Sequence, residues 1–118
     1  MAPPSQLAIA TSVVNRLVKE EASYHKELEK QRASIAKLEQ GGGDENTEYV
    51  LKQERRGVEE TRAIFPQLRD KLQDALARLE YVLVPDNLNG PGYQTTPEDI
   101  AKGQEAVAAA LKAIHSQS

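Results

Sequence analysis

The sequence contains no cysteine and no tryptophan, and it has a single phenylalanine among its 118 residues. The absence of cysteine excludes disulfides and thiolate zinc sites, and it favours a reducing compartment. Aromatic residues make up only 4% of the chain, so little bulky material is present to surround a substrate pocket. We therefore expect no enzyme and no bound cofactor.

The sequence also lacks a strong charge of either sign and a long hydrophobic run. Its net charge of −3 gives no field that would attract nucleic acid. No apolar stretch approaches the roughly 20 residues of a membrane span. The N-terminus has no basic start followed by an apolar block, as a secretory signal would have. We expect a cytoplasmic protein that binds neither nucleic acid nor membrane.

Residues that could perform chemistry are few and scattered. His25 and His115 stand far apart, and His25 is expected to be a solvated histidine at an outer helix position. The glycine run 41–43 has no following Lys-Ser or Lys-Thr pair, so it predicts a turn and not a phosphate-binding loop. No nucleophile has a base within plausible reach. We expect no catalytic and no metal site.

Two long stretches place their core positions at alternating steps of three and four residues, which is typical of helices packed along one seam. In the first stretch these positions are Leu7, Ala10, Val14, Leu17, Glu21, Tyr24, Leu28, Gln31, Ile35 and Leu38. In the second they are Leu51, Glu54, Val58, Thr61, Phe65, Leu68, Leu72, Ala75, Leu79 and Val82. The intervening residues 41–44, Gly-Gly-Gly-Asp, predict a helix stop, a turn and a new start.

Folding the chain back at these glycines brings the two patterns into register. Leu7 then lies opposite Leu79, and Val14 lies opposite Leu72. The polar members also meet each other, because Gln31 falls opposite Glu54 and Tyr24 falls opposite Thr61. The pattern predicts an antiparallel hairpin of one helix over about 5–40 and a second over about 45–83.

A third, shorter helix is predicted over about 97–115, after an irregular loop at 84–96 that is rich in Pro, Gly and Asn. Thr96 is a suitable N-cap, and Pro97 suits the first helical position. The expected apolar stripe of this helix is Ile100, Gln104, Val107, Leu111 and Ile114. The fold class is therefore all-α, an elongated three-helix bundle with coiled-coil or spectrin-like packing in one domain, 1–118.

The third helix is about half as long as the hairpin, so it can cover only one half. Large apolar residues outside the seam predict that it covers the half away from the glycines: Ile9, Val13, Val18, Ile64, Leu76 and Leu83. The half near the glycines would keep a two-helix seam with partly wet apolar groups. That arrangement favours a partner or a second copy of the chain, and hence a possible homodimer.

Two residues are unfavourable in the interior of the second predicted helix. Gly57 costs about 1 kcal/mol relative to Ala, and Pro66 costs about 3 kcal/mol and should kink the helix. Both residues are compatible with neutral sequence change that a long helix tolerates. Alternatively, Pro66 bends the helix to follow a curved partner surface. The charged clusters, such as 54–56, are expected to be solvated helix faces.

Several motifs follow one another in order along the first two predicted helices. Residues 14–21 read Val-Asn-Arg-Leu-Val-Lys-Glu-Glu, and residues 24–27 read Tyr-His-Lys-Glu. Residues 60–66 read Glu-Thr-Arg-Ala-Ile-Phe-Pro. In this order the motifs resemble the tubulin-specific chaperone A (tubulin-binding cofactor A) family, whose Glu-x-Arg-x-x-Ile-Pro stretch is similar to residues 60–66, with Phe65 inserted. The resemblance covers roughly residues 7–83, whereas the loop at 84–96 and the alanine-rich third helix depart from it.

This resemblance implies a three-helix, cytoskeleton-associated protein that holds β-tubulin folding intermediates after their release from the cytosolic chaperonin. It implies no nucleotide use and no catalysis, with either a monomer or a homodimer. The matching residues that could face the partner are Arg16, Lys19, Glu20, Tyr24, Lys26, Glu27, Glu60, Arg62 and Pro66.

Two other functions remain open from the sequence. The first is a structural coiled-coil or spectrin-like module, which should occur as one repeat among several, whereas we expect this chain to stand alone with complete ends. The second is a co-chaperone for another client, which usually needs a strongly basic or acidic docking face. The even charge counts along the chain do not favour such a face.

Overall fold

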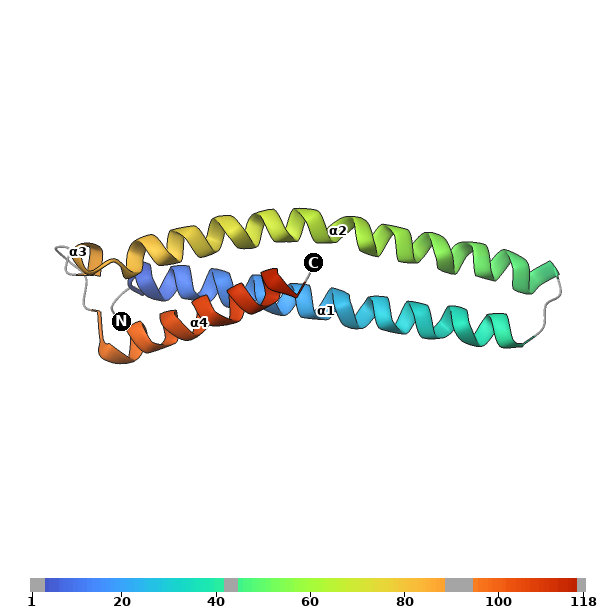
Figure 1. The fold of residues 1–118 in the computed structure, drawn as a ribbon, viewed down its shortest axis with the longest axis horizontal. Helices are drawn as coiled ribbons and strands as arrows, with labels where there is room; N and C mark the ends of the chain where they lie inside the picture. Colours follow the sequence, from blue (N-terminus) through green and yellow to red (C-terminus); the bar gives the residue numbers. More distant parts are fainter. Residues whose placement is uncertain (1–3, 42–44, 89–94, 117–118) are drawn as a thin grey trace. The chain divides into compact units, whose positions relative to one another are not determined.

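The computed structural model of this chain describes residues 4–41, 45–88 and 95–116. Within those residues every regular element is a helix, so the predicted all-α class is confirmed: α1 (Gln6–Gln40), α2 (Glu45–Leu83), α3 (Pro85–Leu88) and α4 (Pro97–His115) (Figure 1). The three long helices begin and end within one residue of the predicted bounds. Residues 42–44 of the predicted turn and 89–94 of the predicted loop lie outside the described residues.

The chain forms two compact units, which are described separately. Unit 1 contains Met1–Glu20 and Leu68–Ser118, and unit 2 contains Glu21–Gln67. Each unit holds one stretch of α1 and one stretch of α2, and unit 1 also holds α3 and α4. A single domain over 1–118 stays a prediction.

The starts of α1 and α4 are capped by side chains. The Oγ of Ser5 accepts a hydrogen bond from the backbone N–H of Ala8 at 3.1 Å, and thereby caps α1. Thr96 caps α4 in the same way, because its Oγ1 accepts from the N–H of Asp99 at 3.1 Å. Such caps satisfy amide groups that have no partner inside the helix. The predicted start of α4 at Thr96 and Pro97 is therefore confirmed.

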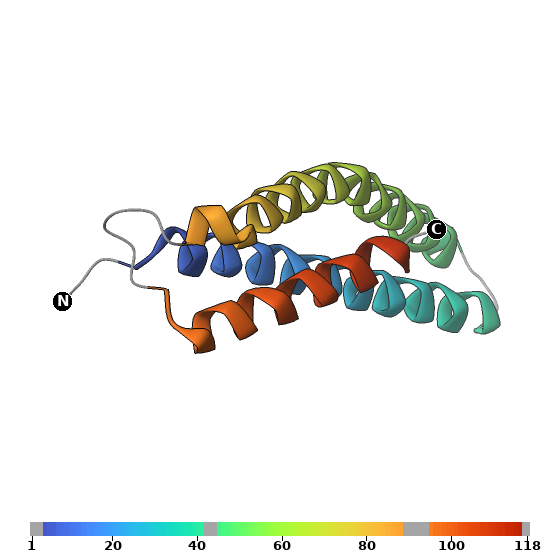
Figure 2. The ribbon, with the colours of Figure 1, turned by 60° about the vertical axis from the view of Figure 1, so that its left-hand side comes forward.

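The seam of unit 1 is formed by the heptad positions that the sequence pattern identifies. Its buried apolar members on α1 and α2 are Leu7, Ala10, Val14, Leu17, Leu68, Leu72, Leu79 and Val82. Leu76, which lies outside the two-helix seam, is buried as well. Figures 1 and 2 show α4 beside the first part of α1 and the last part of α2, so the third helix covers the predicted half of the pattern.

The face by which α4 packs differs from the predicted stripe. Its buried residues are Gly103, Ala106 and Ala110, whereas Gln104 is exposed and Leu111 is 41% exposed. A Cβ at Gly103 would lie 3.1 Å from Leu7 Cδ1, which leaves no room for a larger side chain. Small residues let the α4 backbone approach α1 and α2 closely, so dispersion contacts replace large side chains on this face.

A second expectation, that Ile9 of α1 lies under the third helix, is wrong. The side chain of Ile9 is 50% exposed. Val13, which was also expected under the third helix, is half-buried. The α1 residues that contact the Gly103 position are Leu7 and Thr11. Ile9 stands two residues from each of them, roughly 200° around the helix. It therefore faces away from α4.

Unit 2 has a thinner core, because only α1 and α2 contribute to it. Leu28 and Leu51 are buried, whereas Ile35, Leu38 and Val58 are half-buried. The expectation of a partly wet two-helix seam thus holds for the latter three residues and is wrong for the two leucines.

The first residues of the segment that was predicted as an irregular loop are helical. Pro85–Leu88 form the short helix α3, in which Pro85 occupies the first position. The side-chain Nδ2 of Asn87 donates to the carbonyl of Tyr81 at 2.7 Å, and the Asn87 N–H donates to the carbonyl of Val84 at 2.8 Å. The Tyr81 carbonyl belongs to the last turn of α2, where carbonyls lack α-helical partners, and it also accepts from the Val84 N–H at 3.2 Å. The bond to Val84 ties α3 to the residue that follows α2.

Candidate functional site

The described part of the chain was searched for groups of metal-ligating side chains and for membrane-spanning helices. Residues 4–41, 45–88 and 95–116 contain no group of three or more His, Asp or Glu side chains that could hold a metal ion. No helix among these residues has the length and apolarity needed to cross a membrane. The residues that the sequence motifs predict to face a partner lie on α1 and α2.

Most of the sequence-predicted partner residues are accessible. Eight of the nine are exposed, and Tyr24 is half-buried. Unit 1 carries Arg16, Lys19 and Glu20, and unit 2 carries Tyr24, Lys26, Glu27, Glu60, Arg62 and Pro66. Their exposure leaves these side chains available to a partner.

Within unit 2 the predicted residues do not form one patch. Tyr24 and Glu27 are three residues apart and share a face of α1, whereas Lys26 points about 100° away from Glu27. Arg62 and Pro66 are four residues apart and share a face of α2. Glu60 stands two residues from Arg62, so it lies on nearly the opposite side of α2. A partner that contacts all six must reach more than one face.

Pro66 lies on the exposed side of α2, and the helix continues through it. Its ring cannot donate the backbone hydrogen bond that Arg62 would otherwise accept. Because Arg62 is also exposed, water can satisfy that carbonyl.

Arg16 borders a hollow on the outer side of α1 in unit 1. The hollow measures about 410 Å³ and is lined by Pro4, Ala8, Ile9, Ser12, Val13 and Arg16. Its walls are mainly apolar, with the Arg16 guanidinium as the only charged group among the lining residues. The structure thus places one sequence-predicted residue beside an exposed apolar surface that the sequence had assigned to helix packing.

Unit 2 contains a contact that sequence reasoning missed. The rings of His25 and Phe65 are stacked, with centroids 4.5 Å apart and planes inclined by 29°. His25 Nε2 also lies 3.3 Å from Oε1 of Glu21, whose side chain is 6% exposed. His25 is half-buried and contacts both Phe65 and Glu21. The prediction of a solvated histidine is therefore wrong. It joins α1 to α2 beside Tyr24 and Pro66.

Gln31, which was expected opposite Glu54, also approaches Gly57 in unit 2. Its Nε2 lies 3.3 Å from the position that a Cβ would take at Gly57, three residues farther along α2. Side chains tilt toward the N-terminus of their helix, which accounts for this displacement in an antiparallel pair. The end of the Gln31 side chain thus lies beside the backbone of Gly57.

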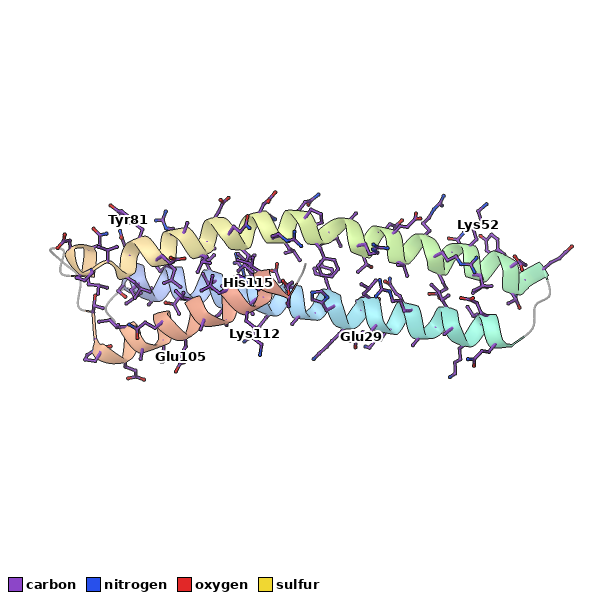
Figure 3. All side chains as sticks on the ribbon, in the orientation of Figure 1. Glu29, Lys52, Tyr81, Glu105, Lys112 and His115 are labelled. Carbon is purple, nitrogen blue, oxygen red and sulfur yellow. The ribbon has the colours of Figure 1, made fainter. Side chains whose placement is uncertain are left out.

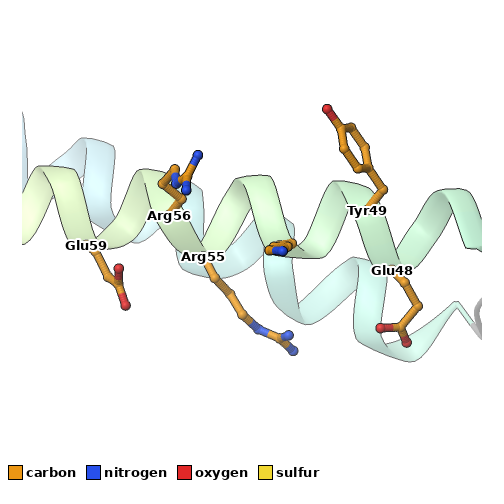
Figure 4. Close-up of a pocket in the computed structure, with 6 residues that line it drawn as sticks. Glu48, Tyr49, Arg55, Arg56 and Glu59 are labelled. Carbon is orange, nitrogen blue, oxygen red and sulfur yellow. The ribbon is translucent and has the colours of Figure 1, made fainter.

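A second surface that sequence reasoning missed lies on the outer side of α2 in unit 2. A hollow of about 570 Å³ is lined there by Glu48, Tyr49, Lys52, Arg55, Arg56 and Glu59 (Figure 4). Tyr49 is 63% exposed. The cluster 54–56 was expected to be an ordinary solvated face. The spacing of Tyr49, Lys52 and Arg56, by three and then four residues, is the signal that could have found it.

Comparison with known proteins gives one consistent result. The sequence model of the family described as tubulin binding cofactor A matches residues 2–107. The chain is 31% identical to tubulin-specific chaperone A of Saccharomyces cerevisiae, over 97% of this chain and 98% of that protein. It is 34% identical to human tubulin-specific chaperone A, over 66% of this chain and 69% of that protein.

A solved structure agrees with the sequence relatives. The crystal structure of tubulin folding cofactor A from Arabidopsis thaliana matches with a TM-score of 0.73 and 34% identity, over 90% of this chain and 92% of that one. The family match extends to residue 107 and thus into α4, although the sequence resemblance was confined to roughly residues 7–83. With a family match and near-full-length relatives above 30% identity, this chain belongs to the tubulin binding cofactor A family.

Proposed function

We propose that this chain is a cytoplasmic tubulin-folding cofactor. It binds β-tubulin and holds folding intermediates after their release from the cytosolic chaperonin. It does so by surface contact, without nucleotide and without catalysis. The observation that carries this proposal is the similarity to tubulin-specific chaperone A over 97% of this chain and 98% of the yeast protein.

The surfaces of both units support this function. The motif residues of the family resemblance are exposed on α1 and α2, with Tyr24 half-buried. Arg16 adds a cation beside the apolar hollow of Ile9 and Val13. Apolar contact with neighbouring charged groups suits recognition of a large protein surface, because apolar area contributes affinity and charge pairs contribute specificity.

The test is co-elution of the purified chain with β-tubulin on a sizing column. The proposal predicts a complex that forms equally with no nucleotide, with GTP and with ATP. A complex that requires nucleotide would overturn the nucleotide-independent part of the proposal. Failure to co-elute in every condition would overturn β-tubulin binding, and would favour a co-chaperone for another client or a structural module.

We also propose that a homodimer, where it forms, uses unit 2. Ile35, Leu38 and Val58 are half-buried there, and no third helix contributes to this unit. Replacing Val58 by Asp should shift sedimentation to the monomer, whereas Leu111→Asp on the exposed side of α4 in unit 1 should not. A dimer lost only with Leu111→Asp would contradict the proposed location.

A further inference from the structure

A groove lies between the end of α2 and the middle of α4 in unit 1. It measures about 310 Å³ and is lined by Glu80, Leu83, Val84, Gln104 and Val107. We call this surface the α2–α4 groove. Figure 2 shows α4 running beside the last part of α2, and both stretches belong to unit 1. The groove is open to a partner, because Val84 on its rim is 43% exposed.

The α4 side of the groove is part of the apolar stripe that the sequence pattern identifies. The small buried residues of α4 pack against the other helices by a different face, so this stripe lies to one side. Ile100, Val107 and Ile114 are half-buried, Gln104 is exposed and Leu111 is 41% exposed. Steps of four and three residues are typical of a seam on which another helix packs. The stripe is about 21 Å long, which is about four helical turns.

The α2 side of the groove carries one charge. Glu80 is exposed, and its neighbours three and four residues away on α2 are uncharged: Leu76, Ala77, Leu83 and Val84. Among the residues that the structure describes, no lysine, arginine or histidine nitrogen lies within 4.0 Å of the Glu80 carboxylate. The carboxylate is therefore available to a cation of a partner.

The charged side chains of α4 point away from the groove. Figure 3 shows Glu105 and Lys112 on the side of α4 directed away from α2, and Tyr81 on the side of α2 directed away from α4. Lys102 lies on the charged side of α4 and is paired with Glu98, with 3.4 Å between Nζ and Oε1. The groove is thus apolar apart from Glu80 and the Gln104 amide.

Other ionisable residues on these flanks are distant from Glu80. Arg69 and Asp70 precede it by ten or more residues, which is about 15 Å or more along α2. His115 follows Val107 by eight residues, which is about 12 Å along α4. None of these groups can neutralise the carboxylate in the groove.

An amphipathic helix with one cation fits this combination. Grooves between helices bind a further helix through apolar side chains spaced three or four residues apart. A lysine or arginine beside those side chains would form a charge-assisted hydrogen bond with Glu80 and fix the register of the bound helix. A second copy of α4 does not present such a cation, because Lys112 points about 100° away from Leu111. An anionic bilayer fits poorly, since helices that bind bilayers carry lysine and arginine beside their apolar face.

We propose that the α2–α4 groove binds an amphipathic helix of the protein client, about four turns long, whose lysine or arginine pairs with Glu80. This inference rests on the proposed function, because it takes the helix to belong to the β-tubulin that the chain holds. Leu111 and Val84 supply apolar contact, and Glu80 selects the register.

The charge is tested with a fluorescein-labelled peptide of about five helical turns, titrated with the full chain. The peptide consists of alanine and glutamine, with leucines at alternating steps of three and four and one lysine beside this stripe. A second peptide has glutamate in place of the lysine. The parent should bind the lysine peptide about threefold to tenfold more tightly than the glutamate peptide. Glu80→Gln should reduce this ratio to less than about twofold, whereas Asp74→Asn, which removes a carboxylate about 120° around α2, should preserve it.

The apolar contact is tested at the exposed leucine. Leu111→Gln should weaken binding of the lysine peptide by about fivefold to tenfold, because less apolar area is buried. Ala109→Gln is the matched control, since it places the same side chain two residues away on the charged side of α4. It should weaken binding by less than about twofold.

Several results would overturn the inference. These are equal effects of Leu111→Gln and Ala109→Gln, a lysine preference that survives Glu80→Gln, or a parent that does not bind the lysine peptide. Leu111-dependent binding to phosphatidylserine vesicles that is tighter than binding to the peptide would make the groove a membrane site. A dimer that Leu111→Gln converts to a monomer in sedimentation would make a second copy the occupant. Either result would also overturn the inference.

The β-tubulin sizing column separates the two proposals. Leu111→Gln should weaken co-elution, and Ala109→Gln should leave it unchanged. Unchanged co-elution with Leu111→Gln would overturn the inference alone. A parent that binds the lysine peptide but no β-tubulin would overturn the proposed function, but not the groove as a helix-binding site.

Discussion

Gly103 of α4 and Leu7 of α1 are in such close contact that a Cβ on Gly103 would lie 3.1 Å from Leu7 Cδ1. The same Cβ would lie 3.3 Å from Leu83 Cδ2 and 3.4 Å from Thr11 Oγ1. Leu7 is 1% exposed and cannot move aside at low cost. Gly103 therefore lies where α4 packs tightly against Leu7 and Thr11 of α1 and Leu83 of α2.

Replacing Gly103 by Leu should destabilise the protein because the added side chain overpacks this contact. We expect a loss of about 2 kcal/mol in the free energy of unfolding, and a fall in Tm of about 8 °C. Gln104→Leu, on the adjacent exposed position, is the control and should change Tm little. Thermal melts followed by circular dichroism give both values, and a Gly103→Leu protein as stable as its parent would contradict the packing described here.

The second helical glycine should respond in the opposite direction. A Cβ at Gly57 meets only the Nε2 of Gln31, the far end of a flexible and half-buried side chain. Gly57→Ala should therefore keep most of its propensity gain and raise the free energy of unfolding by about 0.5–1 kcal/mol. Urea unfolding measures this change. A destabilised Gly57→Ala protein would show that the Gln31 amide cannot move.

The stack of His25 on Phe65 should contribute measurable coupling between α1 and α2 in unit 2. A double-mutant cycle with His25→Ala and Phe65→Ala should give a coupling free energy of about 0.5–1 kcal/mol. The cycle is needed because His25→Ala alone also removes the contact with Glu21. Additive single effects would mean that the two rings are adjacent without stabilising each other.

The outcome at these residues shows what the sequence could predict. The steps of three and four residues placed α1 and α2 correctly, because large apolar residues dominate their seam. The same reasoning was wrong for Gln104 and Leu111 of α4, which are exposed, whereas Ile100, Val107 and Ile114 are half-buried. It missed the buried Gly103, Ala106 and Ala110, since these residues pack by being small and carry little hydrophobic signal. Ile9 was misplaced because hydrophobicity does not say which side of α1 a third helix covers.

The candidate site was less accessible to sequence reasoning. Motif order identified exposed residues such as Arg16 and Arg62, but it gave no information on which of them share a face. His25 was taken as solvated because its position on the repeat is an outer one. Its contact with Phe65 depends on how the side chains tilt between antiparallel helices, which the repeat alone does not encode.

Pro66 gives a test that separates stability from binding. Pro66→Ala restores a backbone donor in α2 and should raise the free energy of unfolding by about 1–3 kcal/mol. If Pro66 bends α2 to follow the client, the same change should weaken β-tubulin capture. Gln67→Ala, at the next exposed position, should leave capture unchanged. If the Pro66→Ala protein captures β-tubulin as well as its parent does, the proline has no role in binding and is only a substitution that the long helix tolerates.

The most direct measurement is capture of tubulin chains from a mixture released by the cytosolic chaperonin. The immobilised chain is added without nucleotide, and the retained α-tubulin and β-tubulin are quantified. Our account predicts that β-tubulin is retained and α-tubulin is not. Retention of neither chain, or equal retention of both, would contradict the proposal that this protein holds β-tubulin during folding.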